Sequence, residues 1–130
     1  MSLSNNRNKK LRILVTGGAG FIGGAVIRKL LTETSFYIFN LDKISYASDL
    51  TSINKTISSL GIKGEERHKL LKVNLTNSSE THSAVKFANP DLIMHFAAES
   101  HVDRSINGPV EFIQSNILGT FNLLEAAREH

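Results

Sequence analysis

The sequence predicts an α/β protein in which helices cover both faces of a parallel sheet, and three observations predict it. Four short apolar segments alternate with four longer segments, most of them amphipathic, in the order β-α-β-α-β-α-β-α. The apolar segments are continuous, as expected of strands that are covered on both faces. Glycines at Gly17, Gly20 and Gly23 follow the first apolar segment directly and open a helix. We therefore expect a doubly wound, three-layer sheet with the strand order 3-2-1-4.

Length and composition limit what this fold can do. The 130 residues are 41% hydrophobic and 21% charged, which suits a single domain with a buried core. The chain has no cysteine, so disulfides, thiolate nucleophiles and cysteine-based metal sites are excluded. No apolar run approaches the roughly 20 residues of a membrane span, and no secretory signal is recognised. We expect a cytoplasmic protein that holds no metal.

The net charge of +3 is modest, and Lys9, Lys10 and Arg12 cluster near the start. This cluster is interpreted as a solvated tail before the first strand. No basic stripe is interleaved with aromatic residues, so nucleic-acid binding is not indicated.

The first half of the chain is expected to hold a leader, two strands and two helices. Residues 1–10 are polar and are predicted to be a disordered leader, and strands are predicted over residues 11–16 and 36–42. A helix is predicted over residues 21–32. Its expected core face comprises Ile22, Ala25, Val26 and Leu30.

Residues 43–64 are polar and are expected to form a loop followed by one helix that ends near Gly61. The apolar spacing that predicts this helix runs through Leu50, Ile53, Ile57 and Leu60. The charged residues 65–69 are expected to be exposed.

The second half repeats the alternation. Strands are predicted over residues 69–75 and 91–96, separated by a helix that Thr76 or Asn77 caps and that runs to about Phe87. The expected buried side of this helix comprises Ala84, Val85 and Ala88. Pro109 suits the first turn of a long last helix. Its apolar stripe comprises Phe112, Ile113, Ile117, Phe121, Leu123 and Leu124. The chain stops at this helix and leaves a sheet edge open, so we expect the N-terminal portion of a longer protein.

Candidate site residues follow the strands, where ligands bind in doubly wound sheets. Gly17 allows the sharp turn, Gly20 lets the backbone approach a pyrophosphate, and Gly23 lets the helix pack closely. The N-terminus of that helix offers N–H groups and a positive dipole end to phosphates. The glycine spacing therefore predicts a dinucleotide site.

Asp42 ends the second strand, where it could accept hydrogen bonds from both adenosine ribose hydroxyls and repel a 2′-phosphate. This favours NAD over NADP, although the neighbouring Lys43 would tolerate a phosphate. The alternative is a solvated Asp at a strand end. Asn74 could accept from the adenine amino group or simply start a turn.

The segment after the fourth strand is dense in polar residues. Ala97 and Ala98 are small enough for a ligand to lie against the backbone, and Ser100 could donate to a phosphate or sugar hydroxyl. His95 lies inside the strand and is interpreted as packed and hydrogen-bonded rather than catalytic. For His101 and Asp103 a structural role is placed slightly ahead of catalysis. Arg104 could meet a diphosphate or form an internal ion pair, and these alternatives stay open.

Residues 16–23, TGGAGFIG, resemble the motif of the extended short-chain dehydrogenases/reductases, the NAD-dependent epimerase/dehydratase family with a Rossmann-type domain. Residues 96–105, FAAESHVDRS, resemble the corresponding segment of dTDP-glucose 4,6-dehydratases, as do residues 42–47 and 106–120. The resemblance covers everything from Leu11 onward. It implies an NAD-dependent lyase that forms dTDP-4-keto-6-deoxyglucose, a precursor of rhamnose and related deoxysugars. In that family NAD takes a hydride from C4 of the glucose ring, water leaves across C5 and C6, and the hydride returns to C6.

Carried over position by position, the resemblance implies contacts with NAD from each strand end, and Ser100 also lies near the substrate. The family usually has Asp where this chain has Asn74, so the match is looser there. The predicted cofactor site comprises Gly17, Gly20, Phe21, Ile22, Gly23, Asp42, Lys43, Ile44, Ser45, Asn74, Leu75, Phe96, Ala97, Ala98, Ser100 and Ser115.

No catalytic residue is predicted within this chain. The family's Tyr-x-x-x-Lys pair and Thr-Asp-Glu group lie beyond the fourth helix, and neither Tyr37 nor Tyr46 is followed four residues later by Lys. We therefore expect dinucleotide binding without dehydratase activity. The resemblance also implies a homodimer through the C-terminal helix, for which packing on the sheet and a following helix is the alternative.

Two other functions remain open: another sugar-nucleotide enzyme of the extended family, such as a UDP-sugar epimerase, and a non-catalytic NAD-sensing or interaction domain. Residues after His130 would discriminate between the dehydratase and the epimerase.

Overall fold

Within residues 9–45, 48–98 and 109–130, which the computed structural model describes apart from the side chains of residues 111 and 112, four parallel strands form one sheet. The strands are β1 (Arg12–Thr16), β2 (Tyr37–Asp42), β3 (His68–Lys72) and β4 (Leu92–His95). Their order is β3-β2-β1-β4, which confirms the predicted topology. The central strand β1 pairs Leu14 with Phe39 of β2 and with Ile93 of β4.

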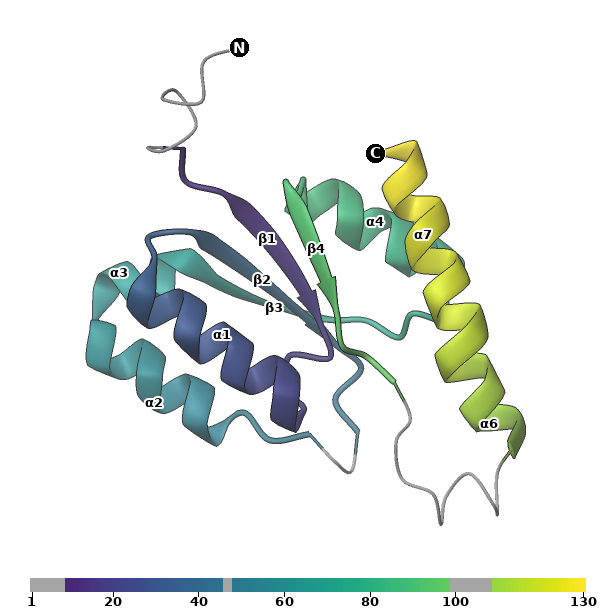
Figure 1. The fold of residues 1–130 in the computed structure, drawn as a ribbon, viewed down its shortest axis with the longest axis horizontal. Coiled ribbons are helices and arrows are strands. Elements are labelled where there is room, and N and C mark those ends of the chain that lie inside the picture. Colours follow the sequence, from purple (N-terminus) through teal and green to yellow (C-terminus); the bar gives the residue numbers. More distant parts are fainter. Residues whose placement is uncertain (1–8, 46–47, 99–108) are drawn as a thin grey trace.

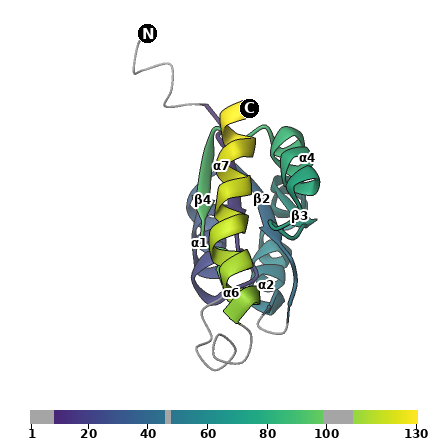
Figure 2. The same ribbon diagram turned by 90° about the vertical axis from the view of Figure 1, so that its right-hand side faces the viewer.

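Helices cover both faces of this sheet (Figures 1 and 2). On one face lie α1 (Phe21–Glu33) and α2 (Thr51–Leu60), with the short α3 (Ile62–Arg67) following α2. On the other lie α4 (Ser78–Ala88) and α7 (Gly119–Glu129). A five-residue α6 (Pro109–Ile113) leads into α7 through a π-helical turn, Gln114–Leu118. Among the described residues, no helix is both long and apolar enough to cross a membrane.

The sheet divides the core into two clusters, because successive side chains of a strand point to opposite faces. Ile13, Val15 and Ile38 pack with Ile27 and Ile53 under α1 and α2. On the other face, Leu14, Phe39 and Leu41 pack under α4 and α7. The continuous apolar strands predicted from the sequence therefore face helices on both sides.

The predicted core face of α1 is only partly correct. Leu30 packs against the core as expected and Val26 is half-buried, but Ile22 and Ala25 are exposed, and the fully buried residues are Gly23, Gly24, Ile27 and Leu31. A Cβ atom on Gly23 would lie 2.2 Å from the Gly17 carbonyl oxygen, so α1 can start this close to the turn only with glycine there. The glycines therefore decide which face of α1 is buried.

A second correction concerns the charged residues 65–69, which were all expected to be exposed. Glu65, Glu66 and Lys69 are exposed, but His68 is half-buried, and so is Arg67 at the end of α3. Its guanidinium donates to the carbonyl oxygens of Leu31 at 2.8 Å, Thr34 at 3.0 Å and Phe36 at 3.1 Å. These carbonyls lie where α1 ends and the chain turns into β2. Strand β3 starts at His68 and ends at Lys72, three residues short of the predicted Leu75.

The predicted solvated tail is wrong for Arg12. Its Nε atom donates to the Ala88 carbonyl oxygen at 2.8 Å, and its guanidinium lies over the Phe39 ring at 4.7 Å from the centroid. The Lys9 ammonium lies 3.0 Å from the Asp91 carboxylate. Residues 1–8 of the predicted leader lie outside the described residues.

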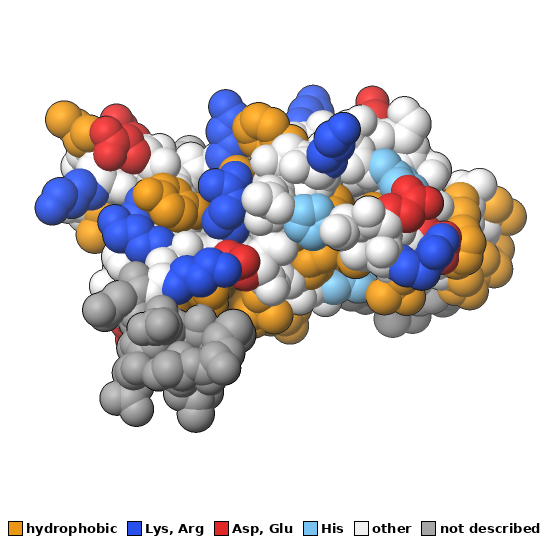
Figure 3. Space-filling view, turned by 90° about the horizontal axis from the view of Figure 1, so that it is seen from above, with side chains coloured by type: hydrophobic (Ala, Val, Ile, Leu, Met, Phe, Trp, Pro, Cys, Tyr) orange, Lys and Arg blue, Asp and Glu red, His pale blue; other side chains and the backbone are white. Residues whose placement is uncertain are grey.

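The predicted apolar stripe of the last helix is also turned away from the core. Ile113, Ile117, Phe121 and Leu124 are all more than half exposed. The buried positions of α7 are Gly119, Asn122, Leu123 and Ala126, mostly small or polar residues that let it approach α4 and the chain at Leu75. Figure 3 looks onto the amino ends of the strands, and hydrophobic side chains gather at its right-hand edge, where α7 lies. Of the six residues expected on this stripe, only Leu123 is shown to be buried, and the side chain of Phe112 lies outside the described part.

Candidate functional site

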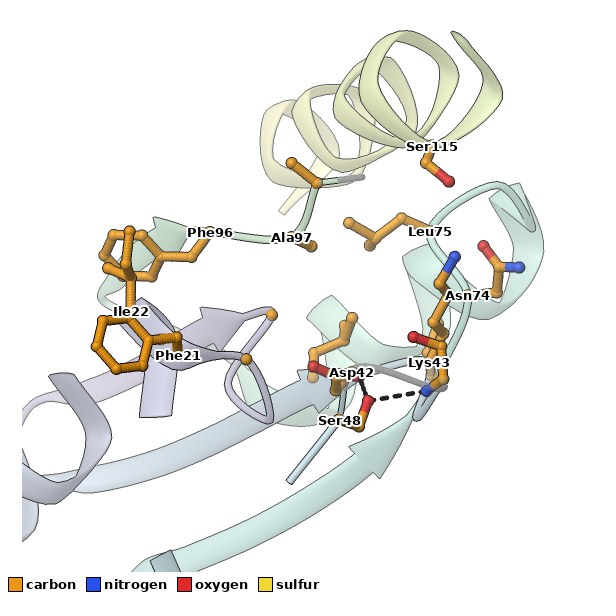
Figure 4. Close-up of a pocket in the computed structure, with 17 residues that line it drawn as sticks. Phe21, Ile22, Asp42, Lys43, Ser48, Asn74, Leu75, Phe96, Ala97 and Ser115 are labelled. Carbon is orange, nitrogen blue, oxygen red and sulfur yellow. Dashed lines mark hydrogen bonds between the residues drawn. The ribbon is translucent and has the colours of Figure 1, made fainter. Parts of the chain in front are cut away.

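A cavity of about 720 Å³ opens at the carboxyl ends of the strands, between the first turn of α1 and the π-helical turn (Figure 4). Its lining residues come from all four strand ends: Gly17, Gly20, Phe21, Ile22, Gly23, Leu41, Asp42, Lys43, Ser45, Ser48, Val73, Asn74, Leu75, Phe96, Ala97, Ala98 and Ser115. Every described member of the predicted cofactor site except Ile44 is among them. Ser100, His101, Asp103 and Arg104 lie outside the described residues.

Three lining residues were not predicted: Leu41, Ser48 and Val73. Leu41 and Val73 are apolar residues at or just beyond the ends of β2 and β3, and nothing in their type distinguishes them from core residues. Ser48 lies in a loop without periodicity, so no sequence signal marked it.

The glycine turn, residues 17–23, shows a separate steric reason for each predicted glycine. Gly17 has a φ of +73°, and a Cβ atom there would lie 2.6 Å from the Ala97 nitrogen. Gly23 lies against the Gly17 carbonyl, as described above. Around Gly20 that same carbonyl, 3.3 Å from the position of a Cβ atom, is the only close neighbour among the described residues, so no described residue closes its other sides. No described side chain caps α1, which leaves its first N–H groups for an anionic ligand. The turn fits a pyrophosphate.

Asp42 joins the end of β2 to the glycine turn. The carboxylate is 8% exposed and accepts from the Ala19 N–H at 3.0 Å and the Ile44 N–H at 2.7 Å. The Ser48 hydroxyl donates to the same carboxylate at 3.3 Å (Figure 4). Asp42 is therefore not the solvated strand-end residue of the alternative interpretation. Ile44, at a φ of +56°, contributes to the site through its backbone N–H rather than by lining the cavity.

Asn74 lines the cavity and also starts a turn. Its amide oxygen accepts from the Thr76 N–H at 3.0 Å and the Thr76 hydroxyl at 2.9 Å. Asn74 can thus start this turn and still line the cavity, so neither interpretation excludes the other. Its contact with adenine stays a prediction. Leu75 and Val73 give this part of the cavity an apolar wall.

His95 is packed and hydrogen-bonded, as predicted. Its Nδ1 atom contacts the Thr16 hydroxyl and its Nε2 atom lies 2.9 Å from the Thr120 hydroxyl. Burial lowers the pKa of His95 below its ordinary value, which keeps the ring neutral near pH 7. His95 does not line the cavity, whereas Phe96, Ala97 and Ala98 directly after it do.

The chemistry of the lining is that of a binding site. Among the lining residues that the structure describes, only Asp42 and Lys43 carry a formal charge, and these described residues include no pair of groups poised for acid–base catalysis. Within the described residues, no group of three His, Asp or Glu side chains could hold a metal ion. The cavity can accept an extended ligand with an anionic centre at the glycine turn and hydroxyl groups at Asp42.

The sequence matches one known protein family and is similar to individual members of known function. The model of the family described as GDP-mannose 4,6 dehydratase matches residues 14–130. A dTDP-glucose 4,6-dehydratase from Escherichia coli is 46% identical over 120 residues, or 92% of this chain and 32% of that protein. One from Neisseria meningitidis is 46% identical over 119 residues, with the same coverage. The chain spans about a third of the length of these relatives.

Two solved structures have the same fold. A dTDP-glucose 4,6-dehydratase from Bacillus anthracis, crystallised with NAD, is 28% identical with a TM-score of 0.71, covering 92% of this chain and 33% of that one. A UDP-glucose 4-epimerase from Thermus thermophilus, also in complex with NAD, is 31% identical with a TM-score of 0.74, covering 92% of this chain and 34% of that one.

Proposed function

The chain belongs to the GDP-mannose 4,6 dehydratase family, and we propose that it is the NAD-binding part of a dTDP-glucose 4,6-dehydratase. The observation that carries this proposal is the meeting of the glycine turn and Asp42 at one cavity. The dehydratases of Escherichia coli and Neisseria meningitidis support the substrate class. The NAD in the Bacillus anthracis and Thermus thermophilus structures supports the cofactor.

Each side of the cavity has a role in holding NAD. The open backbone at Gly20 and the N–H groups at the start of α1 would hold the pyrophosphate. The Asp42 carboxylate would accept from the adenosine ribose hydroxyls, and Ser48 is the donor that such a hydroxyl would replace. Asn74 and Leu75 would face adenine, and Phe96 to Ala98 with Ser115 would line the remainder. Bound NAD supplies a hydride acceptor that returns the hydride later in the reaction.

The parent protein would convert dTDP-glucose to dTDP-4-keto-6-deoxyglucose for deoxysugar synthesis, including rhamnose, as a cytoplasmic lyase. This chain contains no Tyr-x-x-x-Lys sequence, so the chain alone would bind NAD without turning over the sugar nucleotide. A UDP-sugar epimerase is the second candidate, favoured by the likeness to the Thermus thermophilus enzyme. A Thr-Asp-Glu string encoded after His130 would support the dehydratase, and a Ser-Ser or Ser-Thr string would support the epimerase.

The parent protein would also form a homodimer through the C-terminal helix. The exposed Ile117, Phe121 and Leu124 support this, because exposed apolar patches of this kind mark interaction surfaces. Sedimentation of the purified chain with and without Phe121→Glu would test it. A wild-type monomer at high concentration would contradict it.

The cofactor proposal is tested by titrating the purified chain with NAD and with NADP in a calorimeter. NAD should bind, and NADP should bind at least about tenfold more weakly, because a 2′-phosphate would meet the Asp42 carboxylate. Asp49→Asn is the matched control for Asp42→Asn, because the Asp49 carboxylate is exposed and lies outside the cavity. Equal affinity for the two dinucleotides, or no binding of either, would contradict the proposal.

A further inference from the structure

His95 joins two segments that line opposite sides of the cavity, although the ring itself lies behind both. On one side the Thr16 hydroxyl contacts His95 Nδ1 and also accepts from the N–H groups of Phe96 at 3.1 Å and Ala97 at 3.2 Å. On the other side His95 Nε2 lies 2.9 Å from the Thr120 hydroxyl, which donates to the Asn116 carbonyl oxygen at 2.9 Å. This hydrogen-bonded chain therefore runs from β1 and β4 into the π-helical turn.

The donors and acceptors of this hydrogen-bonded chain favour one position for each proton. A hydroxyl has one proton and two lone pairs, and the Thr16 oxygen accepts from two backbone N–H groups, of which the Phe96 N–H is shared with the Thr16 carbonyl at 3.0 Å. Its proton is therefore directed at Nδ1, and the ring proton lies on Nε2, directed at Thr120. The Thr120 proton in turn points at Asn116. Each donor along this hydrogen-bonded chain has one acceptor for its proton, so the hydrogen bonds all run in the same direction, from Thr16 to Asn116.

Each end of this hydrogen-bonded chain contacts a backbone segment that shapes the cavity. The Ala97 nitrogen lies only 2.6 Å from the position of a Cβ atom on Gly17, so the height of Ala97 above the glycine turn determines the width of that side. Asn116 belongs to the π-helical turn, which is closed by the bond from the Gly119 N–H to the Gln114 carbonyl and which carries Ser115 into the cavity. Single π-helical turns within α-helices recur at functional sites.

We propose that His95, as the neutral Nε2–H tautomer, is a positioning residue that sets the spacing between the Phe96–Ala97 strand end and the Ser115 turn, and thereby the affinity of the cavity for dinucleotide. The affinity part rests on the proposed function. The tautomer and the coupling of the two segments do not rest on the proposed function, and they are tested on the purified protein without ligand.

The first experiment records the ring ¹⁵N shifts of His95 at neutral pH in the purified chain, assigned by comparison with His95→Gln. A protonated Nε2 with an unprotonated Nδ1 is expected. The Nδ1–H tautomer or a doubly protonated ring would overturn the proposal.

The second experiment measures amide hydrogen exchange in His95→Leu and in the milder His95→Gln. The Gln side chain keeps a polar group at the site but reaches the two threonine hydroxyls less well than the imidazole does. The Ala97 and Gly119 amides should lose protection together, by about tenfold in His95→Leu, while amides of α2 are unchanged. Loss at one amide without the other would overturn the coupling. His82→Leu is the matched control: this half-buried histidine on α4 contacts the Ser78 carbonyl and the Glu129 carboxylate rather than either cavity segment, so both amides should stay protected.

The third experiment titrates the same variants with NAD at a temperature well below unfolding. His95→Leu should bind about tenfold more weakly than the wild type, and His95→Gln should lie between the two. Unchanged affinity in both variants would overturn the positioning role. If the wild-type chain itself binds no NAD, the proposed function fails, and the tautomer and exchange results still decide whether His95 couples the two segments.

Discussion

The two sides of the cavity are built by different means. The glycine-turn side, residues 17–23 with residues 42–45 and Ser48, is held by backbone N–H groups: Gly17 donates to the Leu41 carbonyl at 2.8 Å and Ala19 to the Asp42 carboxylate. The helix side, residues 96–98 with residues 114–120, is held by side-chain hydroxyls and an imidazole that join segments 25 and 79 residues apart. The first side is therefore sensitive to added volume at Gly17 and Gly23, and the second is sensitive to loss of the hydrogen-bonding groups of Thr16, His95 and Thr120.

The largest effect is expected from Gly23→Ala. A methyl group 2.2 Å from the Gly17 carbonyl oxygen forces α1 away from the turn, which should lower the free energy of unfolding by about 3 kcal/mol and abolish NAD binding. Urea denaturation and calorimetry measure the two effects. Gly20→Ala is the matched control: its nearest neighbour is 3.3 Å away, so stability should change little while NAD binding still weakens. Equal destabilisation by both would refute the steric account.

Asp42→Asn should have the next largest effect. The carboxylate accepts from the N–H groups of Ala19 and Ile44 through different oxygens, and an amide would present an NH₂ group to one of these donors. We expect a loss of about 2 kcal/mol in unfolding free energy and about tenfold weaker NAD binding. The same substitution at the exposed Asp49 should change neither measurement noticeably. A stable Asp42→Asn variant with wild-type affinity would show that this side does not depend on the carboxylate.

Acid should lower the stability of the fold through two half-buried histidines, His95 on the helix side of the cavity and His68 at the start of β3. Burial lowers the pKa of both His95 and His68 in the folded protein, whereas in the unfolded chain each has a pKa of about 6.5. The unfolded state therefore binds more protons as the pH falls below about 6.5, and stability decreases until the lower folded pKa values are reached. Urea midpoints at intervals between pH 7.5 and pH 5 should decrease, and the decrease should be smaller in His95→Gln. Asp91, whose pKa is lowered by the Arg12 N–H and the Lys9 ammonium, acts only at lower pH.

Ser115→Ala should have the smallest effect. Ser115 lines the cavity at half exposure, so loss of its hydroxyl should change the unfolding free energy by less than about 0.5 kcal/mol and weaken NAD binding by about fivefold at most. Calorimetry on this variant beside Thr120→Val separates contact from positioning. If Thr120→Val has the smaller effect of the two, the helix side acts by contact alone.

The sequence predicts best what is decided by neighbours along the chain. The strand order follows from the alternation of strands and helices, Asn77, one of the two predicted caps, accepts from the Glu80 N–H, and Gly17 and Gly23 have the close contacts expected of them. The glycine-turn side of the cavity could therefore be assigned almost residue by residue.

What could not be predicted depends on contacts between distant segments. The buried faces of α1 and α7 consist largely of small residues such as Gly24 and Ala126, whose burial reflects close approach rather than hydrophobicity. The π-helical turn has no sequence pattern of its own, since the segments on either side of it are ordinary helix. Arg67 belongs to a stretch whose charge alone predicts exposure, and only the carbonyls at the end of α1 explain its burial.

Arg67 has a further consequence for how the sheet assembles. It directly precedes β3, an edge strand whose first residue, His68, pairs with Ile38 of β2. The sequence of β3, HKLLK, has no clean alternation of polar and apolar residues and so specifies its alignment weakly. A shift by one residue would carry the guanidinium about 3.3 Å along the strand, out of reach of the carbonyls of Leu31, Thr34 and Phe36. The three hydrogen bonds of Arg67, a side chain outside the sheet, thus favour the observed alignment of β3 over the slipped alternatives.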